Sequence, residues 1–99
     1  MSQFADLVIA DRRLVILRLL EQAPDYQGNA YLLQSALGTF GHSVGMDRLV
    51  TDLHWLAEQD LVQFEQVGGV GIAKLTQRGA DVAAGRCTVP GVKRPAPGV

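Results

Sequence analysis

The side chains that most often catalyse reactions or bind metals are few in this chain and far apart. The two histidines, His42 and His54, lie twelve positions apart, and no HExxH, CxxC or HxH pattern accompanies them. Cys87 is the single cysteine and has no Cys or His partner at metal-ligand spacing. Ser35 and Ser43 lack the neighbours that activate a nucleophile. The sequence therefore predicts no enzyme, no metal site and no cofactor.

A glycine-rich segment, Gly68-Gly69-Val70-Gly71, lacks the lysine and the helix opening of a phosphate-binding loop. The tip of a β-hairpin explains it better, because paired glycines tolerate the positive φ angles of a two-residue turn. Val62–Val67 alternates apolar and polar residues before the turn, and Val70–Leu75 returns. Thr76 then caps a short helix over residues 77–84, which Gly85 ends.

The region before the hairpin has the periodicity of three helices. Apolar residues recur at steps of three and four over residues 3–22, and Pro24 ends this helix because proline disfavours helical geometry in the preceding residue. After a turn at residues 25–28, Asn29 is the expected N-cap of a second helix, which Gly41 closes. The apolar side of the second helix is expected to hold Leu33, Ala36, Leu37 and Phe40.

A short turn, Gly41-His42, leads to the third helix, which we predict over about residues 44–59 with Ser43 as its cap. One side of this helix buries Met46, Leu49, Leu53 and Leu56, and Asp60 follows at a position where such helices often end with glycine. At about 100° per residue, the opposite side carries the remaining side chains. These are Asp47, Arg48, Thr51, His54, Trp55 and Glu58.

Composition indicates one compact domain without strong attraction to nucleic acid or membranes. The chain has 99 residues, 47% of them hydrophobic, and a net charge of −1. No apolar run approaches the ~18 residues of a membrane span, so the cytosol is the default location. After Arg86 the sequence CTVPGVKRPAPGV is rich in proline and has little to bury. We therefore predict a domain over residues 1–85 and a flexible or extended tail over residues 86–99.

The order helix, helix, tight turn, helix, two-stranded hairpin, helix resembles that of winged helix-turn-helix domains. LVTDLHWLAEQDLV is similar to the end of the recognition helix in this family, and LTQRGADVAAG to its closing helix. The match covers about residues 10–85, and the whole chain, including VPGVKRPAPG, is similar to small winged-helix proteins of Mu-like phages and prophages. The resemblance implies an α+β, mostly α fold with three helices, a two-stranded wing and a short C-terminal helix.

The resemblance also implies a bacterial or phage context, in which binding of double-stranded DNA for transcriptional control is the leading expectation. In the family the third helix enters the major groove, and the matching positions here are Asp47, Arg48, Thr51 and His54. Ser43 and the backbone amides of residues 44–46 would hold a phosphate at the start of that helix. The other expected contacts are Gln63 and Gln66 in the wing, and Lys93 and Arg94 in the tail.

The distribution of charge opposes this expectation. Between Asn29 and Leu75 the net charge is −3, whereas a typical DNA-binding protein makes ~6–10 contacts to phosphates through its lysines and arginines. Arg12, Arg13 and Arg18, or the basic residues from Arg78 onward, would have to supply the missing charge. The residues counted between Asn29 and Leu75 are basic Arg48 and Lys74 and acidic Asp47, Asp52, Glu58, Asp60 and Glu65.

The alternative is a winged-helix module that binds protein instead of DNA, as an assembly or regulatory adaptor of a phage. Trp55 lies on the exposed side of the third helix in our assignment, and tryptophan is enriched at interfaces, although the hairpin or the last helix would cover it if either folds back. Phe4, Leu7 and Val8 are more apolar than the start of a helix requires. They form a homodimer contact or pack against the last helix, and the sequence leaves both interpretations open.

Overall fold

The computed structural model describes residues 2–97, so Met1 and residues 98–99, at the outer ends of the predicted domain and tail, lie outside the described residues. Within residues 2–97 the fold is α+β and mostly helical, as predicted, with four α-helices and one antiparallel sheet. The elements are α1 (Gln3–Gln22), a 3-10 turn (Pro24–Tyr26), β1 (Gln27–Asn29), α2 (Ala30–Thr39), α3 (Met46–Glu58), β2 (Val62–Val67), β3 (Val70–Leu75) and α4 (Gln77–Ala83).

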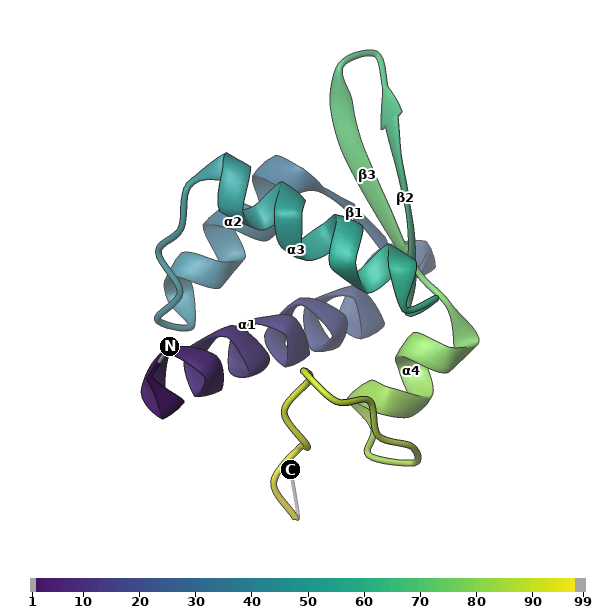
Figure 1. Cartoon of the computed structure of the whole chain (residues 1–99). Coiled ribbons are helices and arrows are strands. Elements are labelled where there is room, and N and C mark those ends of the chain that lie inside the picture. Colours follow the sequence, from purple (N-terminus) through teal and green to yellow (C-terminus); the bar gives the residue numbers. More distant parts are fainter. Residues whose placement is uncertain (1, 98–99) are drawn as a thin grey trace.

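The layout places α1 at the centre of the molecule. Figure 1 shows α2 and α3 on one side of α1, and α4 with the C-terminal segment on the other. The hairpin of β2 and β3 projects away from the helices beside the end of α3 (Figure 1). None of the helices in this part of the chain is both long enough and apolar enough to cross a membrane.

Local capping sets the helix boundaries largely where the sequence indicates. The side chain of Asn29 accepts a hydrogen bond from the Leu32 amide, and that of Thr76 accepts one from the Gly79 amide, so both predicted N-caps are confirmed. Asp60, which follows α3, has a φ of +62°, the left-handed conformation that glycine often supplies after a helix.

The sheet has three strands in the order β1-β3-β2, one more than the two-stranded hairpin that the sequence predicts. The hairpin itself has the predicted bounds, and its turn residues Gly68 and Gly69 have φ angles of +58° and +80°. The missed strand, β1, occupies Gln27–Asn29, part of which was expected to be a turn. Three residues are too few to show an alternating pattern, and β1 exists only because it pairs with β3.

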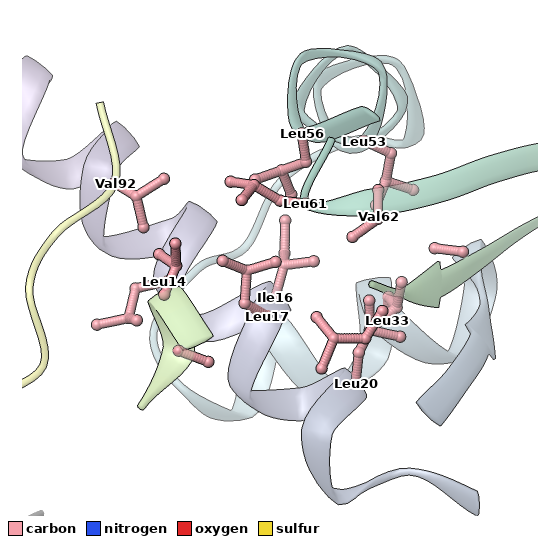
Figure 2. Packing of buried hydrophobic residues seen from close by; sticks show 14 of the residues in the cluster. Leu14, Ile16, Leu17, Leu20, Leu33, Leu53, Leu56, Leu61, Val62 and Val92 are labelled. Atoms are coloured by element: carbon pink, nitrogen blue, oxygen red, sulfur yellow. The ribbon is translucent and has the colours of Figure 1, made fainter. Parts of the chain in front are cut away.

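The core forms where α1, α3 and the base of the sheet meet (Figure 2). Leu49, Leu53 and Leu56 are fully buried, which confirms the predicted inner side of α3. Phe40, in contrast, is 60% exposed although its spacing placed it on the inner side of α2. The helix ends at Thr39 and Phe40 has left helical geometry, so the helical spacing no longer determines where its ring points.

The connection between α2 and α3 is longer than predicted, because α3 begins at Met46 with Gly45 as its N-cap. Ser43 is exposed and does not cap the helix, so that prediction is wrong. The buried His42 holds this connection: its ring Nε2 lies 2.7 Å from Asp11 Oδ2 on α1, and its amide donates to the Leu37 carbonyl. Tertiary anchoring of His42 therefore keeps residues 40–45 out of the helix.

The segment after α4 is extended and non-helical, as the composition predicts, but the expectation that it has little to bury is wrong. Val89 and Val92 are buried against the core. The Lys93 amide donates to the carbonyl of Ala10 at 3.1 Å, and Arg13 Nη1 donates to the Gly91 carbonyl at 3.0 Å. The C-terminal segment thus approaches α1 at Gly91 and Lys93, where α1 offers carbonyl and guanidinium partners that lie about 80 positions away in the sequence.

Candidate nucleic-acid interface

The outer side of α3 carries the four side chains that the sequence assigned to base contacts. Asp47, Arg48, Thr51 and His54 are all exposed, since the leucines of the same helix occupy its inner side. Gly45 lines a shallow hollow together with the first three of them. The geometry therefore brings the predicted helix contacts together on one surface, which we call the α3 face.

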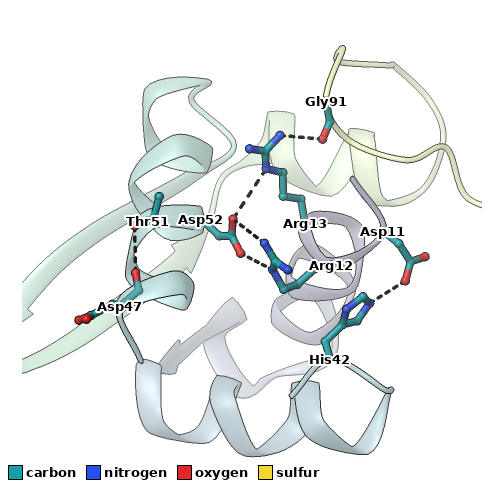
Figure 3. Close-up of polar contacts among 8 residues, drawn as sticks. All are labelled: Asp11, Arg12, Arg13, His42, Asp47, Thr51, Asp52 and Gly91. Carbon is teal, nitrogen blue, oxygen red and sulfur yellow. Dashed lines mark hydrogen bonds and ion pairs between the residues drawn. The ribbon is translucent and has the colours of Figure 1, made fainter. Parts of the chain in front are cut away.

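Two members of the α3 face already have intramolecular partners. The Thr51 hydroxyl donates to the backbone carbonyl of Asp47 at 2.9 Å, so its oxygen lone pairs remain for an external donor (Figure 3). The His54 ring meets Phe64 of β2 edge to face, with ring centroids 5.0 Å apart and an interplanar angle of 87°. Arg48 has no hydrogen bond or ion pair to another residue in the 2–97 range, so its guanidinium is available to a ligand.

The predicted contacts on the hairpin lie along one exposed strand. Gln63 and Gln66 are exposed on β2, where Gln63 pairs with Lys74 and Gln66 with Gly71 of β3. Gln66 lines a hollow with Met46 and Val50, so it lies at the start of α3 rather than at a distance from it. Lys74 was not among the predicted contacts. It is exposed on β3 beside Gln63, and its positive charge lies on the surface of the hairpin.

A buried ion pair removes two charges from the surface. Arg12 of α1 donates through Nε to Oδ2 of Asp52 at 2.5 Å and through Nη2 to Oδ1 at 3.3 Å (Figure 3). The two side chains are only 5% and 2% exposed. Arg12 therefore cannot serve as a phosphate contact, and Asp52 does not repel one. Excluding Asp52, the net charge of exposed residues between Asn29 and Leu75 is −2 instead of −3.

Arg13 is also held inside the molecule. Its guanidinium lies 3.8 Å from the centre of the Trp55 ring, a cation–π contact, while its Nε is 3.9 Å from Asp52 Oδ1. Burial lowers the pKa of Arg13 from its ordinary value, and the charge of Asp52 offsets part of that effect. Arg12 and Arg13, two of the three arginines on α1 that could have contacted DNA, are thus bound to Asp52 and Trp55 within the protein.

Trp55 is half-buried, so the expectation that its ring is exposed is wrong. The cover is neither the hairpin nor α4 but the C-terminal segment at Gly91, which has a φ of +96° and lies against the ring. A glycine is needed there because a Cβ atom would lie 2.9 Å from Trp55 and 3.0 Å from Arg13. Arg13, Trp55 and Gly91 therefore form a three-layer contact between α1, α3 and the C-terminal segment.

Most cations near the C-terminus also have internal partners. Arg86 Nε lies 2.9 Å from Asp81 Oδ1, and Arg78 Nε donates to the Gln59 carbonyl at 3.1 Å. Lys93 Nζ lies 3.1 Å from Asp11 Oδ1. Arg94 is exposed and, within the described residues, takes part in no ion pair. Of the two predicted tail contacts, Lys93 is therefore ion-paired with Asp11 and Arg94 is not.

Asp11 connects three parts of the chain, since it contacts His42 from the α2–α3 connection and Lys93 from the C-terminal segment. Partial burial acts to raise its pKa, but the hydrogen bonds from His42 and Lys93 outweigh that effect and hold the pKa below its ordinary value. Over residues 2–97 no group of three or more His, Cys, Asp or Glu side chains is placed so that it could hold a metal ion.

Comparison with known proteins gives the relationship of the chain. No protein-family model matches it. The uncharacterized protein gp26 of Escherichia phage Mu is 47% identical over 92 residues, which cover 93% of this chain and 95% of gp26. The chain belongs to the family of phage Mu gp26. An uncharacterized protein of Haemophilus influenzae is 38% identical over 76 residues, covering 76% of this chain and 74% of that protein. The predicted relationship to Mu-like phage proteins is confirmed.

In this member of the gp26 family, Gly91→Ala is expected to release the C-terminal segment from Trp55. The added methyl group enters the space of the indole ring and of Arg13, and alanine disfavours a φ of +96°. We expect stronger quenching of tryptophan fluorescence by acrylamide and a loss of about 1–3 kcal/mol of stability. Trp55 is the single tryptophan, so the emission reports this contact directly. Thr88→Ala, at an exposed position of the same segment, is the control; equal quenching in both variants would contradict the prediction.

Proposed function

We propose that this gp26-family chain is a winged helix-turn-helix protein that binds double-stranded DNA and controls transcription for a phage or prophage in the bacterial cytoplasm. The observation that carries the proposal is the α3 face beside the projecting hairpin. An exposed α-helix has the width of the major groove, and a β-ribbon at its side can reach the adjacent backbone. In this proposal α3 is the recognition helix and the hairpin of β2 and β3 is the wing.

The side chains of the α3 face match the hydrogen-bonding groups of base edges better than they match phosphates. Arg48 can donate two hydrogen bonds to a guanine, and the Asp47 carboxylate can accept from the amino group of a cytosine. The Thr51 oxygen retains acceptor capacity. An aspartate is repelled by phosphate, so we place Asp47 over the bases in the centre of the groove.

The remaining surface cations limit the strength of the electrostatic contribution. Arg48, Lys74 and Arg94 are exposed, whereas Arg12, Arg13 and Lys93 are engaged within the molecule. Each phosphate contact contributes a slope of about −0.9 to the dependence of log affinity on log salt concentration. We therefore expect weak nonspecific binding with a shallow salt dependence, and a sequence preference set by the α3 face.

Arg48→Ala is expected to weaken binding to a preferred duplex by about 1–3 kcal/mol, because it removes the guanidinium of the α3 face. The measurement is fluorescence anisotropy at low salt with duplexes selected from a random pool by the wild-type protein. Arg86→Ala, which removes an exposed arginine already paired with Asp81, is the matched control and should bind like wild type. Failure of the wild-type protein to bind any duplex at low salt would refute the proposed function.

A second candidate function is a winged-helix module that binds a protein partner without DNA. Exposed apolar side chains favour it: Tyr31 and Leu32 at the start of α2 are 60% and 65% exposed, and Val67 near the hairpin tip is 56% exposed. Tyr31 and Gly69 line the same hollow, so these groups lie at one end of the molecule. Trp55 no longer supports this candidate, because the C-terminal segment covers it.

A further inference from the structure

Apolar side chains recur along the side of α1 opposite Arg13 and Leu20. Phe4 and Leu7 are 74% and 54% exposed, so most of each side chain is left uncovered by the rest of the chain. Val8, Val15 and Leu19 continue the row and are partly buried, and Val15 and Leu19 also pack against the core. Their spacing places them on one side of the helix, which we call the outer stripe.

At one end of the outer stripe the surface is hollowed, and at the other end the ring of Phe4 projects into solvent. Phe40, which leaves the end of α2 with 60% of its surface exposed, lines the hollow together with Val15, Leu19 and two polar residues of α1, Arg18 and Gln22. Phe4 projects from the opposite end of the same helix. The outer stripe thus has an exposed phenylalanine ring at one end and, at the other, a hollow whose apolar lining of Val15, Leu19 and Phe40 could receive such a ring.

We propose that the outer stripe binds the outer stripe of a second copy of this chain, with the two α1 helices antiparallel. If Phe4 of each copy lies opposite Gln22 of the other, then Val8 lies opposite Arg18, and Asp11 opposite Val15. Each Phe4 ring then enters the hollow beside Leu19 and Phe40 of the other copy. The contact is the same on both sides, so it closes as a two-fold dimer and leaves no free outer stripe.

The charges on this side of α1 favour the antiparallel arrangement. Asp11 and Arg18 lie on the same side of the helix as the outer stripe. In the antiparallel register, Arg18 of one copy is offset from Asp11 of the other by three residues, about 4.5 Å along the axis. Parallel helices would instead bring Arg18 to Arg18 and Asp11 to Asp11. The Asp11 side chain is 34% exposed, so its carboxylate remains accessible beyond its bonds to His42 and Lys93.

The dimer contact is independent of the proposed DNA contact. Arg13 and Leu20, which face Asp52 of α3 and the core, lie on the side of α1 opposite the outer stripe. A second copy on the outer stripe therefore leaves the α3 face uncovered. Arg48→Ala should not change the oligomeric state, and a variant of the outer stripe should not change how the α3 face is exposed, so each proposal can fail without the other.

Light scattering during size-exclusion chromatography over the micromolar range tests the dimer. We expect the wild-type chain to be dimeric and Phe4→Asp to raise the dimer dissociation constant by about tenfold or more, because a charge replaces the ring that fills the hollow. Tyr31→Asp is the matched control, since Tyr31 is a similarly exposed aromatic residue on another surface. Circular dichroism checks that both variants are folded. A monomeric wild-type chain, or equal weakening by both substitutions, would overturn the proposal.

Disulfide formation tests the register. In a Cys87→Ser background, Phe4→Cys combined with Gln22→Cys should give covalent dimers under mild oxidation, since a disulfide needs Cα atoms within about 7 Å of each other. Phe4→Cys alone should not, because the two cysteines of an antiparallel dimer would lie about 27 Å apart along the helices. Efficient cross-linking through Phe4→Cys alone would indicate parallel helices and overturn the antiparallel arrangement.

Discussion

Asp52→Asn is expected to lower the free energy of unfolding by about 3–5 kcal/mol, because it leaves a buried arginine without its counter-ion. Arg12 is 5% exposed and donates two hydrogen bonds to the carboxylate of Asp52. Asparagine preserves the shape of the side chain but carries no charge and offers only one oxygen. Urea denaturation measures the effect. Asp47→Asn, at an exposed position of the same helix, should change stability by less than about 0.5 kcal/mol.

A double replacement distinguishes the buried charge from a loss of packing. Arg12→Met combined with Asp52→Leu removes both charges and keeps apolar volume at the contact between α1 and α3. Buried ion pairs replaced in this way by hydrophobic residues are often neutral or gain stability, so the double variant should be more stable than Asp52→Asn. If it is instead less stable than the single variant, the ion pair contributes favourable energy of its own and our explanation is wrong.

Gly79→Ala is expected to destabilise the protein by about 3 kcal/mol, at the upper end of the range for overpacked interiors. Gly79 lies in the first turn of α4, where its Cβ atom would collide with the backbone carbonyl oxygen of Leu61 and lie 2.7 Å from the side chain of Leu75. The Leu61 carbonyl cannot move freely, since it accepts a hydrogen bond from the amide of Thr76 at 3.1 Å. Alanine therefore displaces α4 from the base of the hairpin. Thermal and urea denaturation measure the loss.

Gly38→Ala is the matched control and should have the opposite sign. Gly38 is an exposed residue within α2, and no atom lies within 4 Å of the position that its Cβ would take. Alanine in a helix interior stabilises by about 0.5–1 kcal/mol relative to glycine, because less backbone entropy is lost on folding, and in the last turn of α2 we expect a gain of up to about 0.5 kcal/mol. Equal effects of the two substitutions would show that helix propensity, not the contact with Leu61, determines the response at Gly79.

The internal partners of the arginines change the interpretation of the charge pattern. Counted along the chain, Arg12 and Arg13 are a basic pair that could add positive charge to the candidate nucleic-acid interface. In the folded protein Arg12 neutralises Asp52, and Arg13 stacks on Trp55. These contacts attach α3 to α1 and so fix the direction in which the α3 face points. The arginines therefore position the candidate site instead of contributing to its surface charge.

Helical periodicity predicts much of the candidate site. The leucines at positions 49, 53 and 56 of α3 determine its buried side, and the exposure of Arg48 and Thr51 on the other side follows directly. The hairpin is equally local, because alternation sets the strands and the paired glycines set the turn. The caps at Asn29 and Thr76 are predictable for the same reason, since each bonds to an amide three residues ahead.

The sequence by itself determined the features that depend on neighbours within one or two turns of chain: the existence of the helices, the caps at Asn29 and Thr76, the hairpin and the exposed side of α3. Only the tertiary structure decided the partners of Arg12, Arg13 and Asp11, the cover over Trp55, the strand β1 and the docking of the C-terminal segment. Those contacts join residues 40, 78 and 82 positions apart. Many residues along a chain could pair with a given charged or aromatic side chain. Which of them becomes its partner depends on how the helices pack around the core, and that packing is not visible in the local sequence.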